Sequence, residues 1–356
     1  MAVTESPPAI VSDIAARALF EEARRRRRRR YRWSAAVLVV VVAIVAGFAL
    51  ANRTGPPLRP ALPPGELPQW TATHEATHQT PATYVAGDGK GGIGMYSTAT
   101  GALIRTISPE ESGDLDQEAM LSANRESVYF AQQVGSCSGV ILRAPTSGAN
   151  DPSVAISIPG TMALDPSPSP TSNDLAWIDD TCGASGTAST TTLYITNQTT
   201  HVTSQLGNLG SIGDAKIAWS RNGKQIAVEN GHTIEVVAAN SMKWSQAKSM
   251  EVANGCNLTS PAYLSGSNQL AAIRYCWSSP SRPSTSTALV FNVTRGKPIA
   301  RIASAPRFAT FQGLSIDRTG THILLGVARP TSAMTVAIED GRLVTVSSSS
   351  PTGAEW

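Results

Sequence analysis

One short segment of the sequence has the residue types and spacing of a zinc hydrolase. His74, Glu75 and His78 match the pattern H-E-x-x-H, in which one face of a helix presents two imidazoles to zinc while the glutamate acts as general base. Threonines flank the motif and Pro81 follows it, and both residue types disfavour the helix that this chemistry needs. We interpret the match as coincidence, with a loosely held surface metal as the alternative, and expect no metal site and no cofactor.

Two other groups of residues have types that could carry chemistry. Residues 135–139 (GSCSG) resemble a nucleophile elbow with Cys137 in the centre, but an elbow needs a helix directly after it and no helical periodicity follows. Acidic residues between 110 and 118, and the pair Asp179 and Asp180, are of the type that binds calcium, yet the glycine-punctuated D-x-D-x-D pattern is absent. We expect a disulfide-bearing loop and solvated acidic residues, and no catalytic residue.

The net charge of +3 combines two unlike regions. Residues 1–33 carry nine arginines and four acids, a net of 9 − 4 = +5, so the remaining residues carry 29 − 9 = 20 basic and 26 − 4 = 22 acidic side chains, a net of −2. The main body therefore lacks the basic excess of a nucleic-acid-binding protein, and we expect no nucleic-acid partner. Only 15% of the residues are charged, which argues against a coiled coil.

Residues 34–51 form the one long uncharged apolar run of the sequence. As a helix this run spans about 27 Å, which matches the hydrocarbon core of a bilayer. The arginines on its N-terminal side predict a cytoplasmic N-terminus and an extracytoplasmic main domain. A cleavable signal peptide is the alternative, because residues 49–51 (ALA) fit a small-x-small cleavage pattern, and it gives the main domain the same location.

These features predict four regions: a cytoplasmic Arg-rich tail over 1–33, a transmembrane helix over 34–51, a Pro-rich stalk over 52–79 and an extracytoplasmic domain over 80–356. Six prolines between 52 and 70 favour a semi-rigid, extended stalk. The tail has apolar residues at helical spacing, so it either docks a cytoplasmic partner as a short helix or only sets topology and contacts anionic lipid.

Short β-branched runs broken by Gly, Asn, Ser and Pro fill the main domain, and one outline recurs among them. The clearest copy, KIAWSRNGKQIAV at 216–228, is an extended run, a tight polar turn and a second apolar run. Similar copies begin at Met120, Tyr263 and Leu314, and a more distant one begins at Ala163; the serines and turns of successive copies fall about 45 to 50 residues apart. That period, with four strands to a unit, indicates the blades of a β-propeller.

The string WSRNGKQIAV at 219–228 resembles the bacterial WD40-like propeller repeat of the TolB type, whose pattern is roughly F-S-P-D-G-K-x-I-A-F. Arg221 and Asn222 depart from the Pro-Asp pair, and the other copies keep only the serine and the apolar strand. The resemblance supports the architecture but transfers no functional residue, because this repeat serves binding scaffolds, assembly factors and peptidase accessory domains alike. The matching residues are Ser220, Gly223, Lys224, Ile226 and Ala227.

Counting the copies gives six modules, the first of which begins at Thr83. We therefore predict an all-β, six-bladed β-propeller preceded by one transmembrane helix, with seven blades as the alternative. The first module lacks an innermost strand. Either residues 70–77 or a C-terminal segment supplies this strand and closes the ring.

The connections predict which face binds a ligand. With strands a to d counted outward from the channel, the a-to-b turns are mostly tight, whereas the b-to-c connections are long near 133–139, 180–191, 277–287 and 329–333. Insertions in a repeat array concentrate on the working face. We therefore expect ligand contacts on the b-to-c face.

Four cysteines in an extracytoplasmic domain predict disulfides. Cys256 and Cys276 are symmetric about a hairpin centre near Gly266, which predicts a cross-strand bridge. Cys137 and Cys182 occupy equivalent loops of neighbouring modules and are expected to join two blades. Free reactive thiols are the alternative, and the absence of C-x-x-C spacing argues against metal ligation.

Together these features predict a membrane-anchored extracytoplasmic β-propeller, held in the lipid bilayer through 34–51, that acts as a binding or assembly module in a bacterial cell envelope. Its expected partner is an envelope protein or a glycan. The alternatives are an envelope hydrolase with an active site in the channel and a transmembrane signalling protein whose cytoplasmic helix docks a regulator. The sequence leaves open whether the protein is an enzyme.

Overall fold

The computed structural model describes most of the main domain. The chain divides into two compact units, Met1–Pro63 and Pro64–Trp356, and every described residue belongs to the second. No helix among these residues is long and apolar enough to cross a membrane. The predicted tail and transmembrane helix lie outside the described residues and stay predictions. The described ranges are 67–70, 81–87, 92–108, 119–135, 138–148, 151–181, 190–210, 215–240, 244–277, 285–305, 309–329, 332–339, 342–347 and 352–355.

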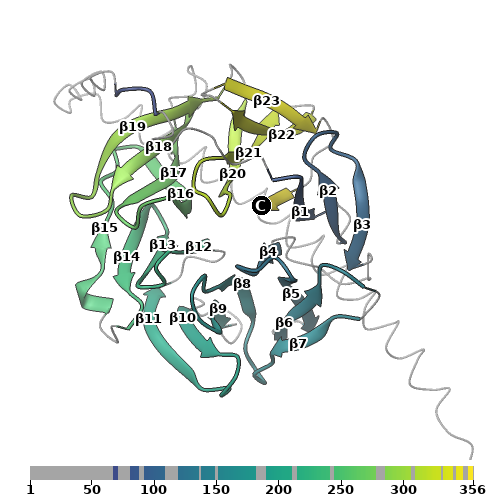
Figure 1. Ribbon diagram of the computed structural model, residues 1–356. Coiled ribbons are helices and arrows are strands. Elements are labelled where there is room, and N and C mark those ends of the chain that lie inside the picture. The colour runs from purple at the N-terminus through teal and green to yellow at the C-terminus, as the bar shows by residue number, and fades with distance from the viewer. Residues whose placement is uncertain are drawn as a thin grey trace, which may run out of the picture. The chain divides into compact units, whose positions relative to one another are not determined.

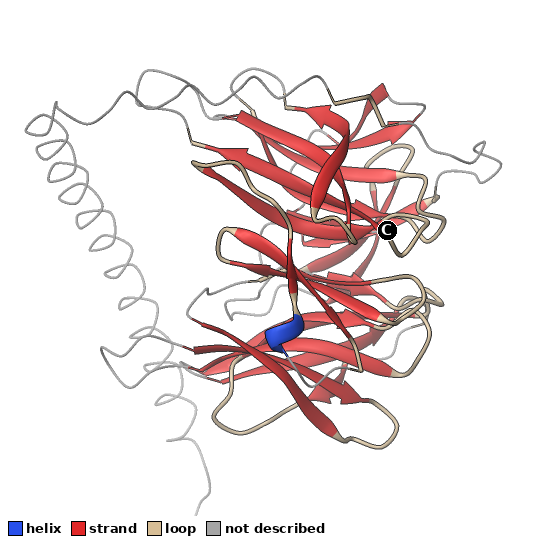
Figure 2. Ribbon diagram, turned by 90° about the vertical axis from the view of Figure 1, so that its left-hand side faces the viewer, coloured by secondary structure: helices blue, strands red, loops and turns tan. Residues whose placement is uncertain are grey.

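The described strands form six four-stranded sheets that radiate from a common centre (Figure 1). Viewed from the side, the strands run between two faces and the turns gather at those faces (Figure 2). The predicted all-β propeller fold is therefore confirmed. Sheet 1 contains β24 (Thr352–Glu355), β1 (Thr83–Gly87), β2 (Ile93–Ser97) and β3 (Leu103–Ser108); sheet 2 contains β4 (Ala119–Leu121), β5 (Ser127–Gly135), β6 (Ser138–Pro145) and β7 (Ser153–Ile156); sheet 3 contains β8 (Ala163–Pro168), β9 (Asp174–Thr181), β10 (Thr190–Asn197) and β11 (Thr203–Gly210).

The other three sheets follow in chain order, and each sheet again begins with its innermost strand. The one helical element described, η1 (Trp244–Gln246), lies in the connection between β14 and β15. Sheet 4 contains β12 (Ile217–Trp219), β13 (Gln225–Asn230), β14 (Thr233–Ala238) and β15 (Lys248–Ser249); sheet 5 contains β16 (Cys256–Tyr263), β17 (Gln269–Cys276), β18 (Thr285–Asn292) and β19 (Lys297–Ser304); sheet 6 contains β20 (Thr310–Ile316), β21 (Ile323–Arg329), β22 (Ser332–Glu339) and β23 (Arg342–Ser347).

The core lies between the sheets. In β13, Ile226 and Val228 pack into the cluster shared with sheet 3, whereas Ala227 between them packs into the cluster shared with sheet 5. Successive side chains of a strand point to opposite faces, so a strand with both faces buried is a continuous apolar run rather than an alternating one. This geometry explains why the second half of each repeat is a continuous apolar run and does not alternate between apolar and polar residues.

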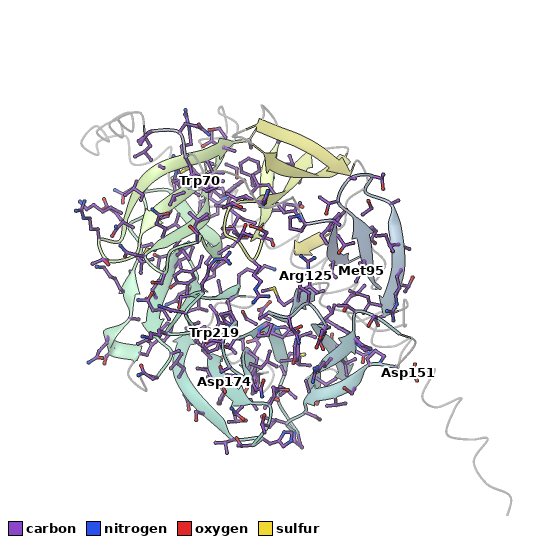
Figure 3. All side chains as sticks on the ribbon, viewed as in Figure 1. Trp70, Met95, Arg125, Asp151, Asp174 and Trp219 are labelled. Atoms are coloured by element: carbon purple, nitrogen blue, oxygen red, sulfur yellow. A yellow bond between two sulfur atoms is a disulfide. The ribbon has the colours of Figure 1, made fainter. Side chains whose placement is uncertain are left out.

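The ring is closed by the C-terminal segment. β24 pairs antiparallel with β1, with Val85 opposite Glu355 and Gly87 opposite Thr352, and it forms the innermost strand of sheet 1. This confirms one of the two closures that the sequence predicts. The other segment considered for closure was 70–77. Its first residue, Trp70, does not line the channel but lies at the outer edge of sheet 5 (Figure 3).

Residues 67–70, the described part of the predicted stalk, run along the outermost strand of sheet 5. Gln69 forms a parallel bridge with Arg301 of β19, whose amide donates to the carbonyl of Pro68 at 2.9 Å and whose carbonyl accepts from the amide of Trp70 at 2.8 Å. Trp70 and Leu67 pack against two neighbouring core clusters. The end of the stalk is therefore attached to the propeller and covers an otherwise unpaired strand edge.

Two of the four long b-to-c connections are shorter than the sequence predicts. β5 runs on to Gly135, which pairs with Ser138, and β21 runs on to Arg329, which pairs with Ser332, so only 136–137 and 330–331 connect these strands. The polar residues that mark the expected loops instead continue the strands beyond the core. The other two connections, 182–189 and 277–284, are long as predicted.

The predicted bridge between Cys256 and Cys276 is present, and the two residues lie opposite each other in the register of β16 and β17. Cys137 and Cys182 lie outside the described residues, so their pairing stays a prediction. Two described residues close to them in the sequence share a contact: Gly139 donates to the carbonyl of Thr161 at 3.0 Å and bridges Met162, whose carbonyl accepts from the amide of Asp180 at 3.1 Å.

We predict that deletion of residues 352–356 destabilises the whole propeller. The deletion removes the backbone partner of β1 and uncovers the inner edge of sheet 1, at an expected cost of about 3 kcal/mol. Urea denaturation followed by circular dichroism measures this cost. Deletion of Trp356 alone is the control, because it leaves β24 intact, and equal stability of the two truncated chains would contradict the closure.

Candidate functional site

Five turns between the first and second strands of a sheet meet on one face of the ring. The clearest runs from Ser220 to Gln225. The amide of Ser220 donates to the carbonyl of Gln225, Gly223 donates to the Ser220 carbonyl, and the Gln225 amide donates to the Ser220 Oγ at 2.8 Å. Gly223 has a positive φ of 67°, which glycine adopts without strain. We call the five turns 122–127, 169–174, 220–225, 264–269 and 317–322 the turn ring.

In the turn 122–127 an arginine takes the place of that glycine. Arg125 has a φ of 60°, which costs a residue with a side chain roughly 1 kcal/mol. Its guanidinium donates to the carbonyl of Thr83 in the neighbouring sheet at 2.7 Å. Burial lowers the pKa of Arg125, and the negative charge of Asp317 opposes that shift. The strained turn thus fixes a cation at the centre of the ring (Figure 3).

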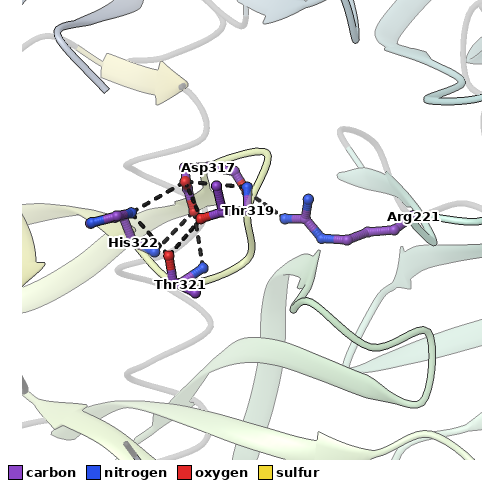
Figure 4. Close-up of polar contacts among 5 residues, drawn as sticks. All are labelled: Arg221, Asp317, Thr319, Thr321 and His322. Atoms are coloured by element: carbon purple, nitrogen blue, oxygen red, sulfur yellow. Dashed lines mark hydrogen bonds and ion pairs between the residues drawn. The ribbon is translucent and has the colours of Figure 1, made fainter. Parts of the chain in front are cut away.

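In the turn 317–322 an aspartate takes the place of Ser220. The Asp317 carboxylate accepts from the amides of Thr319, Thr321 and His322, from the Thr319 hydroxyl and from His322 Nδ1 at 3.2 Å (Figure 4). Burial raises the pKa of Asp317, but hydrogen bonds from Thr319 and His322 and the charge of His322 outweigh it, so the pKa lies below its usual value. Asp317 is 2% exposed, and its carboxylate oxygens accept hydrogen bonds from residues of its own turn, so this side chain stabilises the turn.

Neighbouring turns contact each other through glycines. A Cβ on Gly320 would lie 2.2 Å from the amide nitrogen of Ser265, and a Cβ on Gly223 would lie 2.0 Å from the hydroxyl of Thr171. Both glycines also have a positive φ, which disfavours a side chain at each position, and at Gly320 the neighbouring backbone leaves no room for one. Neighbouring turns are therefore in close contact, which restricts their movement.

Arg221 joins three turns of the ring. Its Nε donates to the carbonyl of Leu264 at 3.0 Å, and its Nη2 donates to the carbonyl of Asp317 (Figure 4). Burial lowers its pKa, the charge of Asp317 opposes the shift, and the exposed Arg318 adds to it. A guanidinium has five N–H donors, so Arg125 and Arg221 keep donors beyond these contacts while their positions are fixed. This face has the chemistry to bind carboxylates.

An open groove of about 910 Å³ leads outward from the turn ring between sheets 3 and 4. Its walls include Trp219 and Val202, and Lys224 and Gln225 extend it from the turn ring. The side-chain oxygen of Gln225 is buried and has no hydrogen-bond partner. The groove therefore combines the exposed cation of Lys224 with apolar surface. Its other lining residues are Asp174, Ile195, Asn197, Thr200, Ser204, Gly223, Ala238, Ala239 and Asn240.

The residues that the sequence analysis considered for chemistry do not form a common site in the described part of the structure. The segment from His74 to His78, Cys137 and the acidic residues between 110 and 118 lie outside the described residues. Asp179 is described, and burial raises its pKa, with the Met162 amide opposing and Asp180 reinforcing the shift. Among the described residues no three His, Cys, Asp or Glu side chains gather as metal ligands would.

The sequence contains a signal for the turn ring in two segments of the same outline. The segments SRNGKQ and DRTGTH have equal length and place arginine and glycine at the same positions, so an alignment of the two would have identified Asp317 as the equivalent of Ser220. The prediction that ligand contacts lie on the b-to-c face is not tested, because most of those connections lie outside the described residues. The described groove lies on the opposite face.

We predict that Asp317→Asn lowers the free energy of unfolding by about 2 kcal/mol at neutral pH, because the amide nitrogen faces donors that the carboxylate accepts. The pKa of Asp317 is lower in the folded protein than in the unfolded chain. Its contribution is therefore complete above pH about 4 and is lost as the pH falls through the folded pKa. The difference between the two proteins should accordingly shrink at acidic pH.

Urea denaturation between pH 2.5 and 7 tests this prediction. The exposed Asp151, at the periphery of the ring, gives the matched control Asp151→Asn, which should behave as the parent protein at every pH (Figure 3). A deficit for Asp317→Asn that stayed constant from pH 7 to pH 2.5 would show that packing, not charge, is the contribution of Asp317.

Comparison with known proteins identifies solved structures with a similar fold. No family model and no curated protein matches the sequence. Among solved structures, TolB from Acinetobacter baumannii is similar at a TM-score of 0.58 with 11% identity, over 77% of this chain and 65% of that protein, so the chain spans slightly under two thirds of this relative. A putative TolB from Agrobacterium tumefaciens gives 0.52 with 12% identity, over 74% of this chain and 87% of that protein.

An oligogalacturonate lyase in complex with manganese is also similar, with a TM-score of 0.51 and 10% identity over 72% of this chain and 70% of that one. An enzyme and TolB proteins thus share this architecture, and identities this low concern the fold alone. The resemblance to TolB-type propellers that the repeat indicates is confirmed at the level of the fold.

Proposed function

We propose that this protein is a membrane-anchored extracytoplasmic β-propeller that binds a protein partner as an assembly module of a bacterial cell envelope. The observation that carries the proposal is the groove between sheets 3 and 4, which opens from the rigid turn ring. A preformed surface binds without the entropic cost of ordering its own loops. The TolB-type fold supports the proposal as an analogy.

The chemistry of the groove favours an extended acidic segment of the partner. The exposed ammonium of Lys224 pairs with a carboxylate, and the exposed side chain of Val202 contacts an apolar residue. A folded partner that presents such a segment makes both contacts at once. Arg125 and Arg221 extend the positive charge inward to the channel and attract the same segment.

The proposed location rests on the apolar run 34–51, the arginines before it and the disulfide. A bridge between Cys256 and Cys276 suits a compartment outside the reducing cytoplasm. We also propose the second bridge between Cys137 and Cys182, because hydrogen bonds connect Gly139 to Thr161 and Asp180 to Met162, and Gly139 and Asp180 each lie two residues along the chain from one of the cysteines.

Photocrosslinking in intact cells tests the binding surface. We predict that a photoreactive residue at Lys224 or Val202 gives the same discrete protein adduct, and that one at Val154 gives none. Val202 and Val154 are both 61% exposed, but only Val202 lines the groove. Lys224→Glu should reduce the adduct from position 202 at least fivefold, because it opposes an acidic segment with like charge. Equal adducts from all three positions would contradict the proposed surface.

Thiol labelling tests the location and both bridges. We predict that the full chain in intact cells contains no maleimide-reactive thiol and that four appear after denaturation and reduction. Cys137→Ser should release one reactive thiol, that of Cys182. A chain without 34–51 stays in the cytoplasm, where its thiols should react directly. Reactive thiols in the untreated full chain would contradict the extracytoplasmic location.

A further inference from the structure

An aromatic cluster lies on the face opposite the turn ring, where strands b and c of sheets 4 and 5 connect. Trp277 directly follows β17 and is 53% exposed. Its ring meets the ring of Tyr275 edge to face at 5.5 Å and the ring of His232 edge to face at 6.4 Å. His232 belongs to the short connection between β13 and β14, so two sheets contribute to the cluster.

The backbone around Trp277 is fixed on both sides. The amide of Trp277 donates to the carbonyl of Gly255 at 3.1 Å, directly beside the bridge between Cys256 and Cys276. The amide of Leu258 in sheet 5 donates to the carbonyl of His232 at 3.1 Å and ties the two sheets together. The exposure of the indole is therefore a built feature of the hairpin end rather than the result of a frayed strand.

Trp277 is the one aromatic among the large exposed apolar side chains of the described surface. The others are leucine, isoleucine and valine. Keeping an indole half in water forgoes roughly 1 kcal/mol or more of burial free energy. Such a residue is expected where it contacts a partner, because exposed aromatics are concentrated at binding sites.

Two polar side chains beside the indole have unused hydrogen-bonding groups. His232 Nδ1 lies 2.7 Å from the side-chain oxygen of Asn257. An amide oxygen only accepts, so Nδ1 is the donor of this hydrogen bond and Nε2 is left to interact with a ligand. The amide nitrogen of Asn257 likewise remains as a donor. The site therefore combines one apolar ring face with one acceptor and one donor at its edge.

We propose that Trp277, His232 and Asn257 form a binding site for a polysaccharide with uncharged pyranose rings. A pyranose ring has an apolar C–H face and a rim of hydroxyl groups. The C–H face carries partial positive charge and stacks on the negative face of the indole. The hydroxyls donate to His232 Nε2 and accept from the Asn257 amide.

The composition of the site favours a glycan over the two other ligands that bind exposed aromatics. A bilayer surface would need an apolar patch surrounded by lysines and arginines, whereas the two hydrogen-bonding neighbours of Trp277 are a histidine and an asparagine. A proline-rich peptide would need a groove lined by several aromatics. This site lies on the opposite face from the groove between sheets 3 and 4, so a failure of one proposal leaves the other unaffected.

Binding assays with the full chain in detergent test the proposal. The probes are tetrasaccharides of β-1,4-linked N-acetylglucosamine, β-1,4-linked glucose and α-1,4-linked glucose, together with purified bacterial cell-wall sacculi. We expect the protein to bind at least one probe and Trp277→Ala to weaken that binding at least tenfold. Trp277→Phe should retain part of it, and His232→Ala and Asn257→Ala should each weaken it about threefold to tenfold.

The matched control is Val134→Ala. Val134 lies near the same face at the end of β5, is 56% exposed and lies in another sheet, so this variant should bind as the parent protein does. Thermal unfolding confirms that each variant is folded. Failure to bind any of the four probes, or unchanged binding by Trp277→Ala, overturns the proposal. Binding to anionic liposomes or to a proline-rich peptide that depends on Trp277, without binding to a glycan, overturns it as well.

Discussion

Each sheet of this propeller has two apolar faces, and that constraint determines the rest of the structure. Ala227 of β13 packs against sheet 5 while its neighbours Ile226 and Val228 pack against sheet 3, so sheet 4 has no face left for water. A sheet of this kind is stable only between two others, and the series ends only when the last sheet contacts the first. The two ends of the domain must therefore meet. They meet in sheet 1, where β24 from the C-terminus pairs with β1 and ties the closing contact into one hydrogen-bonded sheet. The described part of the cluster between sheets 6 and 1 contains Tyr84, Ala86 and Leu324, and Tyr96 packs against it.

Ring closure also brings the innermost turns together, and here contact is made without an apolar core. Gly320 lets its turn approach the backbone of Ser265, Gly223 lies against the side chain of Thr171, and Arg221 links the carbonyls of Leu264 and Asp317. A buried guanidinium bound to carbonyl oxygens keeps its charge while its side chain is immobilised. The result is a face that holds guanidinium groups in fixed positions, although the domain as a whole is slightly acidic. Local placement of a few arginines, rather than net charge, therefore determines what this face attracts.

The repeat allowed the architecture to be predicted because burial on both faces leaves a strong apolar pattern in every second strand. The bridge between Cys256 and Cys276 could be predicted for a related reason, since residues equidistant from a hairpin centre must lie opposite each other. The features that escaped prediction depend on backbone contacts or on position in space. Pairing of Gln69 with Arg301 at a strand edge needs no particular side chain, and the strand that continues through Gln133 to Gly135 is polar because it extends beyond the core. Asp317 was missed because its chemistry differs from that of Ser220, even though both accept from the amide five residues later.

The close packing of the sheets limits how the two proposed binding sites can communicate. Coupling between two sites requires an element with two alternative arrangements that both ligands influence. The described sheets are packed on both sides and their central turns are in van der Waals contact, so a second arrangement would need the ring to open. Ligands on the two faces are then expected to bind independently, and the protein would act by holding them at a fixed separation. In the proposed membrane-anchored protein, a fixed separation would suffice for function, because tethering one ligand raises the effective concentration of the other without any change in affinity.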